Sequence, residues 1–458
     1  MFEFGRELRR FLGGEPVAGV FRDGLTGGDS SLLELLDLRL LINEARGADV
    51  AAGRIGVKDR GTRLIEASVA WREVARRSGD ATALRKAASS AEAAAKLLAE
   101  QHKASGVARA RAEQGLCALL GAELFGDEGL VAAAERVLAE AAGASGVGAA
   151  LAEATLAGIR GRSALGSSTG VATIAAAYEA PLAALGAAGR ASPAARLMAA
   201  EHRIARADLL SLEGAALRNK DLIDHGVREA KAALSGLDLA VEPLSWGRAK
   251  AVEGAALARL AELTGDVGAA ADGVDALAGA LEQVAKDHSP LDWARIQAGL
   301  GQALIVLGET SDNPRAFEQA VTCFDRAELV LKEQPALALR AQAAGARAMA
   351  LGRQAELTGD LAVLDVAIAA LKTELCRLKP SADPVAWAVA QMNLARLYET
   401  RVDITGRDDG GLEAAAVALA TAMDVFGEEG MRSLTDLAHQ ALERLRTRGA
   451  PHQADGRP

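Results

Sequence analysis

Aromatic side chains are scarce in this chain. Only 3% of its 458 residues are Phe, Trp or Tyr, although half of the residues are hydrophobic. The buried volume must therefore come from Ala, Leu and Val, and small side chains let helices approach closely. Runs of β-branched or aromatic residues of strand length are also scarce, whereas Ala, the best helix former, is abundant. These features predict an all-α chain.

Cysteines and long apolar runs are also few. The cysteines, Cys117, Cys323 and Cys376, are odd in number and widely separated, so they imply no disulfide framework and favour a reducing compartment. No apolar run reaches the ~18 residues that a membrane-spanning helix needs. The N-terminus carries acids and lacks the pattern of a secretory signal. We therefore expect a cytoplasmic location.

Basic charge is not in excess, because the formal net charge is −9. Binding to a phosphate backbone depends on clustered Lys and Arg, so nucleic acid is not an expected partner.

The common motifs of catalytic and metal sites are missing as well. There is no His-Glu-x-x-His, no Gly-x-Ser-x-Gly, no P-loop and no Cys-x-x-Cys pair. Asp221 and His225 lie one helical turn apart, where they could hold a metal, but a local ion pair near a helix start is the favoured interpretation. We expect no enzyme activity, no catalytic residue, no metal and no cofactor. A site assembled from distant parts of the chain stays open.

What the chain does contain is a recurring Gly-Asp dipeptide. Looser matches at Asp221, Asp312 and Asp408 complete a spacing of about 47 residues, within the range of helical solenoid repeats. A left-handed glycine ends a helix and an aspartate caps the next, so each junction is predicted to separate a helix A from a helix B. The four full junctions are Gly79-Asp80, Gly126-Asp127, Gly265-Asp266 and Gly359-Asp360.

The start of helix A recurs too. Proline, which suits the first turn of a helix, occurs at 243, 290, 335 and 384. Tryptophan follows three residues later at Trp246, Trp293 and Trp387. We expect these rings to fill gaps between neighbouring repeats, and the alternative is an exposed aromatic platform for a ligand.

Two segments with this start carry a resemblance to a known family. Residues 289–304 read Ser-Pro-Leu-Asp-Trp-Ala-Arg-Ile-Gln-Ala-Gly-Leu-Gly-Gln-Ala-Leu, and residues 383–395 read Asp-Pro-Val-Ala-Trp-Ala-Val-Ala-Gln-Met-Asn-Leu-Ala. Both resemble the Asp-Pro-x-x-Trp-Ala-x-x-Gln-x-Asn-Leu-Gly unit of long-period bacterial tetratricopeptide-like (TPR-like) repeats. The resemblance is clearest over 240–427. It implies a right-handed superhelical α-solenoid of antiparallel helix pairs and an adaptor role, with HEAT-like repeats as the structural alternative.

The chain is expected to have five parts. These are an amphipathic N-terminal segment (1–13), a degenerate opening or capping unit (14–53), an array of about eight helix-pair repeats (54–430), a C-terminal capping helix (431–448) and a flexible tail (449–458). In the opening unit, Leu32 to Leu36 has the apolar pattern of a helix B.

A solenoid exposes an extended concave surface, and we expect a protein or peptide partner to bind there. Polar residues next to the Trp position are the candidate contacts, although solvated helix faces or hydrogen bonds between helices are equally good interpretations. These candidates are Arg248, Arg295, Gln297, Gln391 and Asn393.

The N-terminal segment is the least ordinary part of the chain. In a helix it would place apolar side chains on one face and basic ones on another. It could cap the first repeat, dock into a partner or, least favoured because of Glu3 and Glu7, touch an anionic membrane. The residues concerned are Phe2, Phe4, Leu8, Arg9, Arg10, Phe11 and Leu12.

Two alternatives to a scaffold follow from the same sequence. The chain could be a self-assembling component, as a homo-oligomer or attached to a larger particle through its N-terminal segment. It could also be an enzyme or a small-molecule sensor with a site inside the superhelix.

Overall fold

The computed structural model describes residues 30–54, 56–127, 129–167, 170–332, 338–381 and 383–449. All regular elements in these ranges are helices, so the predicted all-α class is confirmed. No helix there is both long and apolar enough to span a bilayer. The N-terminal segment 1–13, Pro335 and all but the first residue of the tail 449–458 lie outside the described residues.

The chain divides into two compact units, unit 1 (residues 1–299) and unit 2 (residues 300–458). Unit 1 holds η1 (Ser30–Leu35), α3 (Leu38–Gly53), α4 (Arg60–Ser78), α5 (Ala81–Glu100), α6 (Ala104–Phe125), α7 (Gly129–Ala142), α8 (Val147–Ser163), α9 (Gly170–Gly189), α10 (Pro193–Ala216), α11 (Lys220–Ser235), α12 (Pro243–Thr264), α13 (Val267–Gln283) and the start of α14 (Pro290–Ser311). Unit 2 holds the rest of α14 with α15 (Pro314–Leu331), α16 (Ala338–Thr358), α17 (Leu361–Arg377), α18 (Pro384–Thr405), α19 (Gly411–Glu428) and α20 (Arg432–Gly449).

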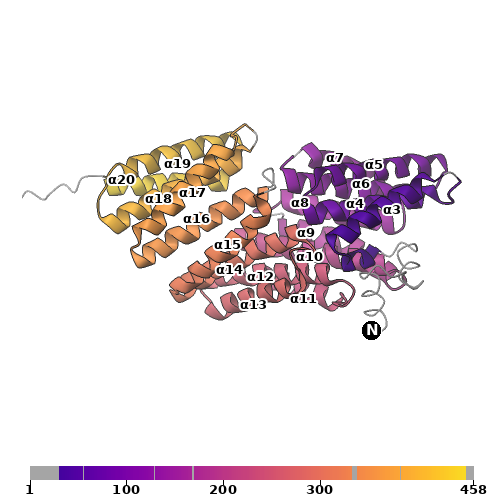
Figure 1. Cartoon of the computed structure of the whole chain (residues 1–458), viewed down its shortest axis with the longest axis horizontal. Helices are drawn as coiled ribbons and strands as arrows, with labels where there is room; N and C mark the ends of the chain where they lie inside the picture. The colour runs from indigo at the N-terminus through magenta and orange to yellow at the C-terminus, as the bar shows by residue number, and fades with distance from the viewer. Residues whose placement is uncertain are drawn as a thin grey trace, which may run out of the picture. The chain divides into compact units, whose positions relative to one another are not determined.

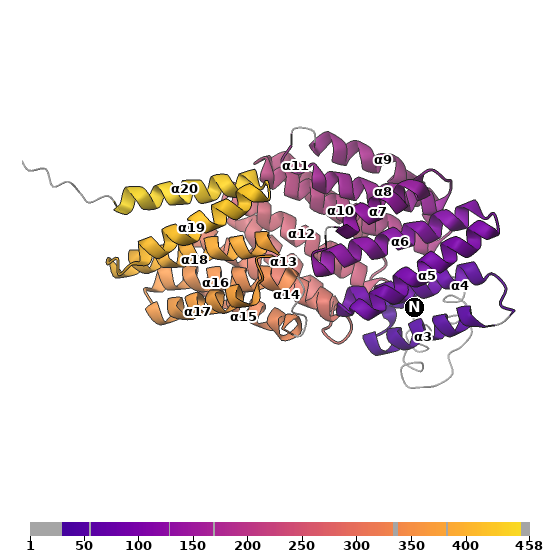
Figure 2. The ribbon, with the colours of Figure 1, turned by 90° about the horizontal axis from the view of Figure 1, so that it is seen from above.

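Consecutive helices pack side by side as pairs, for example α4 with α5, α12 with α13 and α18 with α19 (Figures 1 and 2). The first helix of each pair, helix A, also contacts helix A of the next pair. These contacts join α4, α6, α8, α10 and α12 in unit 1, and α16 and α18 in unit 2. The fold is therefore a helical array of antiparallel pairs, the organisation that the TPR-like resemblance implies. The handedness of a superhelix stays a prediction.

The Gly-Asp junctions work as predicted. Gly265 has a φ of +70° and its N–H donates to the carbonyl of Ala261. The carboxylate of Asp266 then accepts the N–H groups of Gly268 and Ala269 at 2.8 and 3.3 Å. Gly79, Gly126 and Gly359 at the other three junctions have φ of +74°, +71° and +71°. The aspartate that follows each of them also accepts backbone N–H groups, two at Asp360 and one each at Asp80 and Asp127.

Two of the looser junctions are made by other residues than the predicted ones. Asn219 and Asn313 cap α11 and α15, and the preceding Arg218 and Asp312 adopt left-handed φ values of +51° and +49°. Asparagine is as good a helix cap as aspartate. The capping residue therefore lies two positions before the predicted Asp221 and one position after the predicted Asp312. Asp221 lies inside the first turn of α11.

The opening unit also differs from its predicted helix B. Residues 30–35 form the short 3-10 helix η1, and α3 starts after Asp37, whose carboxylate accepts the N–H of Leu40 at 2.8 Å. The reason is long-range, because the guanidinium of Arg77 donates to the carbonyls of Leu33 and Leu36. In a continuous α-helix these two carbonyls would instead accept hydrogen bonds from backbone N–H groups four residues later.

Small side chains dominate the cores between helices. Around α18, α19 and α20, Ala388, Ala395 and Ala415 are fully buried beside Leu419 and Phe426, and Trp387 is packed against them. This fits the predicted packing role of that ring. All three cysteines are free.

Candidate binding site on the helix A face of unit 1

Charged side chains from distant helices meet on the helix A face of unit 1. We call them the inner charge cluster. It consists of Glu34 on η1, Arg72, Glu73, Arg76 and Arg77 on α4, Glu113 on α6, Glu201 on α10, Arg248 on α12, and Asp292 on α14.

Arg248 lies at the centre of this cluster. Its Nη2 lies 2.6 Å from Asp292 Oδ2 and 3.4 Å from Glu73 Oε1, and its Nη1 lies 3.9 Å from Glu201 Oε1. Burial alone would raise the pKa of Asp292, but the Arg248 guanidinium holds it well below its usual range. Asp292 also accepts a hydrogen bond from the Ser289 hydroxyl at 2.7 Å. The pair is thus a buried, hydrogen-bonded salt bridge.

The α4 side of the cluster binds η1. Arg77 is fully buried, and its Nε donates to Glu73 at 2.8 Å, while its terminal nitrogens donate to the carbonyls of Leu33 in η1 and of Leu36 just after it. Burial opposes ionisation of Glu73, yet Arg77 and Arg248 lower its pKa to about 2. Arg76 reaches across to Glu201 on α10 at 2.5 Å.

Glu34 connects η1 to the start of α12. Its carboxylate accepts the backbone N–H of Ser245 at 2.9 Å and also bonds the Ser245 hydroxyl. The N-cap residue of α12, Glu242, makes no side-chain cap, so Glu34 supplies one from 211 residues away. Burial raises the pKa of Glu34 to about 7, despite the lowering effects of Arg248 and Ser245.

These contacts fix η1, α4, α10, α12 and α14 relative to one another through charges. Buried pairs gain little net stability because desolvation is costly, but losing one partner strands a buried charge. The cluster therefore specifies one arrangement of the helix A face.

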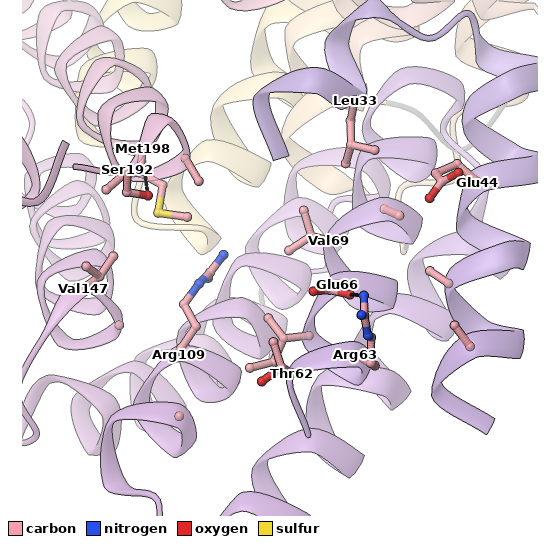
Figure 3. A pocket seen from close by; sticks show the side chains of 18 of the residues that line it. Leu33, Glu44, Thr62, Arg63, Glu66, Val69, Arg109, Val147, Ser192 and Met198 are labelled. Carbon is pink, nitrogen blue, oxygen red and sulfur yellow. Dashed lines mark hydrogen bonds and ion pairs between the residues drawn. The ribbon is translucent and has the colours of Figure 1, made fainter. Parts of the chain in front are cut away.

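Beside the cluster lies a cavity of about 600 Å³, lined by η1, α3, α4, α6, α8 and α10. Its apolar lining includes Leu33, Ile65, Val69, Val147 and Met198. Figure 3 shows Val69, Arg109 and Met198 projecting toward the cavity from three different helices.

The charged groups of the cavity are paired. Arg63 Nη1 lies 2.8 Å from Glu66 Oε2, the contact dashed in Figure 3. Arg109 Nη1 lies 3.0 Å from Glu113 Oε2, and Glu113 also binds Arg72. Glu113 therefore joins the cavity wall to the inner charge cluster.

Close contact between α6 and α8 shapes one side of the cavity. A Cβ on Gly148 would lie 2.4 Å from the backbone nitrogen of Arg109. We expect Gly148→Ala to push the helices apart and lower the free energy of unfolding by roughly 1–3 kcal/mol. Gly279→Ala is the matched control, since nothing lies within 4 Å of its added Cβ, and it should stabilise by about 0.5–1 kcal/mol. Denaturant unfolding measures both, and equal effects would contradict the close contact.

The predicted contact residues lie in different surroundings. Arg248 belongs to the cluster, and Arg295 borders it, because its Nη1 lies 3.8 Å from Asp292 Oδ1. Arg295 also pairs with Glu123 at 2.6 Å, and Gln297 is buried. Gln391 and Asn393 are half-buried on α18 of unit 2, outside this site. A partner contact at any of the five stays a prediction. The predicted docking residues between Phe2 and Leu12 lie outside the described residues.

Sequence reasoning missed most of the site. Glu34, Arg72, Arg76, Glu113 and Glu201 were not among its candidates. The available signal was the placement of charged residues at i, i+4 spacing within alanine-rich helices A, as at Arg109 and Glu113.

The Asp221–His225 pair differs from its prediction. The carboxylate nearest to His225 is that of Glu229, with Oε1 3.9 Å from Nε2, instead of that of Asp221. Burial lowers the pKa of His225. Among the described residues, no group of three or more His, Cys, Asp or Glu side chains is placed to hold a metal ion.

No protein-family model matches the chain, and no curated protein matches it either. Among solved structures, a Rap protein complexed with competence and sporulation factor is similar, with 12% identity, a TM-score of 0.41, and coverage of 85% of this chain and 99% of that chain. The apo form of RapI has 11% identity and a TM-score of 0.38, covering 85% and 98%. A circular tandem repeat protein has 16% identity and a TM-score of 0.22, covering 94% and 93%.

Proposed function

We propose that this chain is a non-catalytic helical-repeat adaptor that binds a protein or peptide partner in the cavity of unit 1. The observation that carries the proposal is the cavity itself, about 600 Å³ between six helical elements. Ligand cavities commonly measure roughly 300–1,000 Å³, with mostly apolar walls and a few placed polar groups. We place the protein in the cytoplasm, since its three cysteines are free.

The lining indicates what kind of segment fits. Ile65, Val69 and Met198 are half-buried and offer apolar contact, and methionine adapts to differently shaped side chains. Arg63, Glu66 and Arg109 supply hydrogen-bonding groups beside them. Because the inner charge cluster ties together four of the six lining elements, η1, α4, α6 and α10, little ordering of these is required on binding, which favours affinity. A peptide with one or two large apolar anchors and polar ends matches this lining.

A small-molecule sensor is the second candidate, because the cavity volume also suits a drug-sized ligand. Thermal-shift screening with metabolites separates the two. A saturable shift that Ala48→Trp abolishes, with no peptide bound, would favour the sensor.

The test of the adaptor is a display selection of random peptides on the full chain. Ala48 lines the cavity from α3, whereas Val50 on the same helix is 61% exposed and outside the lining. Ala48→Trp should therefore place a ring in part of the cavity, and Val50→Trp is its matched control. We expect selected peptides to bind Val50→Trp like the parent and Ala48→Trp at least about tenfold more weakly, equivalent to about 1.4 kcal/mol. Peptides that never distinguish the two variants would contradict the proposal.

A further inference from the structure

The cavity lies beside the start of the described chain. Leu33, which lines it, follows Ser30, the first described residue, by three positions. Sixteen residues separate the segment 1–13 from Ser30. An extended chain spans about 3.3–3.6 Å per residue, so this connection reaches up to about 55 Å. The segment 1–13 is thus tethered within reach of every wall of the cavity.

The composition of the segment complements the cavity. The described residues that line the cavity include no aromatic side chain, and several positions in the lining are as small as Gly47, Ala48, Gly106 and Ala194. The segment, in contrast, holds three of the eight phenylalanines of the chain. A lining of small side chains leaves space that a large ring can occupy. Filling that space is favourable because close-packed protein interiors tolerate few voids.

The sequence of the segment would give a helix one apolar face. Phe4, Leu8 and Phe11 recur at spacings of four and three residues, a pattern that would put them on one side of any helix formed there. Both partners carry both signs of charge, since the segment contains Glu7 and Arg10 and the cavity contains acids and arginines. A helix-in-groove contact buries such a face through anchors at this spacing.

We propose that residues 2–12 of this chain occupy the cavity of unit 1 and compete there with an external peptide. The occupancy stands without an external partner, and only the competition depends on the proposed function. A short tether gives an effective concentration on the order of 1 mM. A contact with an intrinsic Kd of about 100 µM would then fill the cavity about nine-tenths of the time and weaken a competitor about tenfold.

The test uses a fluorescein-labelled peptide with the sequence of residues 1–13. It is titrated by fluorescence anisotropy into the full chain, into the chain lacking residues 2–13, and into that shortened chain carrying Ala48→Trp or Val50→Trp. We expect a Kd of about 100 µM or tighter for the shortened chain and its Val50→Trp form. Binding to the full chain and to the Ala48→Trp form should be at least about tenfold weaker.

Equal affinity for the full and shortened chains would overturn the proposal. So would absence of binding to a shortened chain that melts like the parent, or undiminished binding to Ala48→Trp. A peptide that binds phosphatidylserine vesicles but not the shortened chain would assign the segment to a membrane. The adaptor proposal can survive all of these results, because its test uses selected peptides instead of this segment.

A second measurement uses the intact chain and does not depend on the truncation. The photo-crosslinker benzoylphenylalanine replaces Phe4, and the adducts are mapped by mass spectrometry after tryptic digestion. We expect intramolecular adducts on α4 or on α10, where Met198 lines the cavity. Adducts only between molecules, or only away from the cavity lining, would overturn the proposal.

Discussion

Replacing Arg248 with methionine is expected to lower the free energy of unfolding of unit 1 by about 3–5 kcal/mol. Arg248 is 12% exposed at its side chain and pairs with Asp292 and Glu73. Methionine keeps much of the aliphatic volume but leaves Asp292 without its closest cation. At roughly 1.6 °C per kcal/mol for a unit spanning residues 1–299, the melting temperature should fall by about 5–8 °C, measurable by scanning calorimetry.

Two further variants make this result specific to the cluster. Arg85→Met on α5 removes an exposed arginine whose contact is a 3.3 Å hydrogen bond to Thr82, and should change stability by less than about 0.5 kcal/mol. In Arg248→Met with Asp292→Asn, the stranded charge is gone, so a substantial part of the loss should be recovered. Simple addition of the two single effects would show that Arg248 and Asp292 are not coupled.

Replacing Glu34 with glutamine is expected to stabilise the protein at pH 8 by up to about 3 kcal/mol and to have little effect near pH 5. The carboxyl has a pKa of 4.5 in its ordinary state and of about 7 when buried in the folded chain. Folding therefore favours the protonated form. The stability from this group is fully present below about pH 4.5 and is lost as the pH rises through about 7. Glutamine stays neutral and avoids that loss.

Glu73→Gln is the matched control, with the opposite sign. The pKa of Glu73 falls to about 2 in the folded chain, so its carboxylate stabilises the protein at both pH values. This stabilisation is lost only as the pH falls below about 4.5 toward 2. Glu73→Gln should therefore destabilise at pH 5 and at pH 8. Urea unfolding of the parent and both variants at the two pH values gives the comparison. A Glu34→Gln effect that does not change between them would contradict the buried carboxyl.

The fold was accessible from the sequence because its determinants are local. Gly265 ends α12 and Asp266 starts α13 through contacts within a few residues, and such contacts repeat at a fixed spacing. Where a junction used asparagine, as at Asn219, the helix ends were still found but the capping residue was not. The alanine content and the spacing of the junctions together were enough to predict an array of helix pairs.

The site was less accessible because its contacts are long-range. Arg248 was identified as a candidate from its position after Trp246, but its partner Glu73 lies 175 residues earlier. Glu34 falls within an apolar run that reads as a helix, and only its contact with Ser245 gives it a role. No spacing within one repeat encodes such pairs, since they depend on how several repeats pack around one another.

The most direct measurement of the central claim is the ratio of two dissociation constants. A display-selected peptide is titrated calorimetrically into the Val50→Trp and Ala48→Trp forms, which add the same ring outside and inside the cavity lining. If the partner binds in the cavity, the Kd for Ala48→Trp is at least about tenfold higher than for Val50→Trp. The melting temperatures of both forms should stay near that of the parent. Equal dissociation constants for the two forms would place the partner elsewhere and contradict the account.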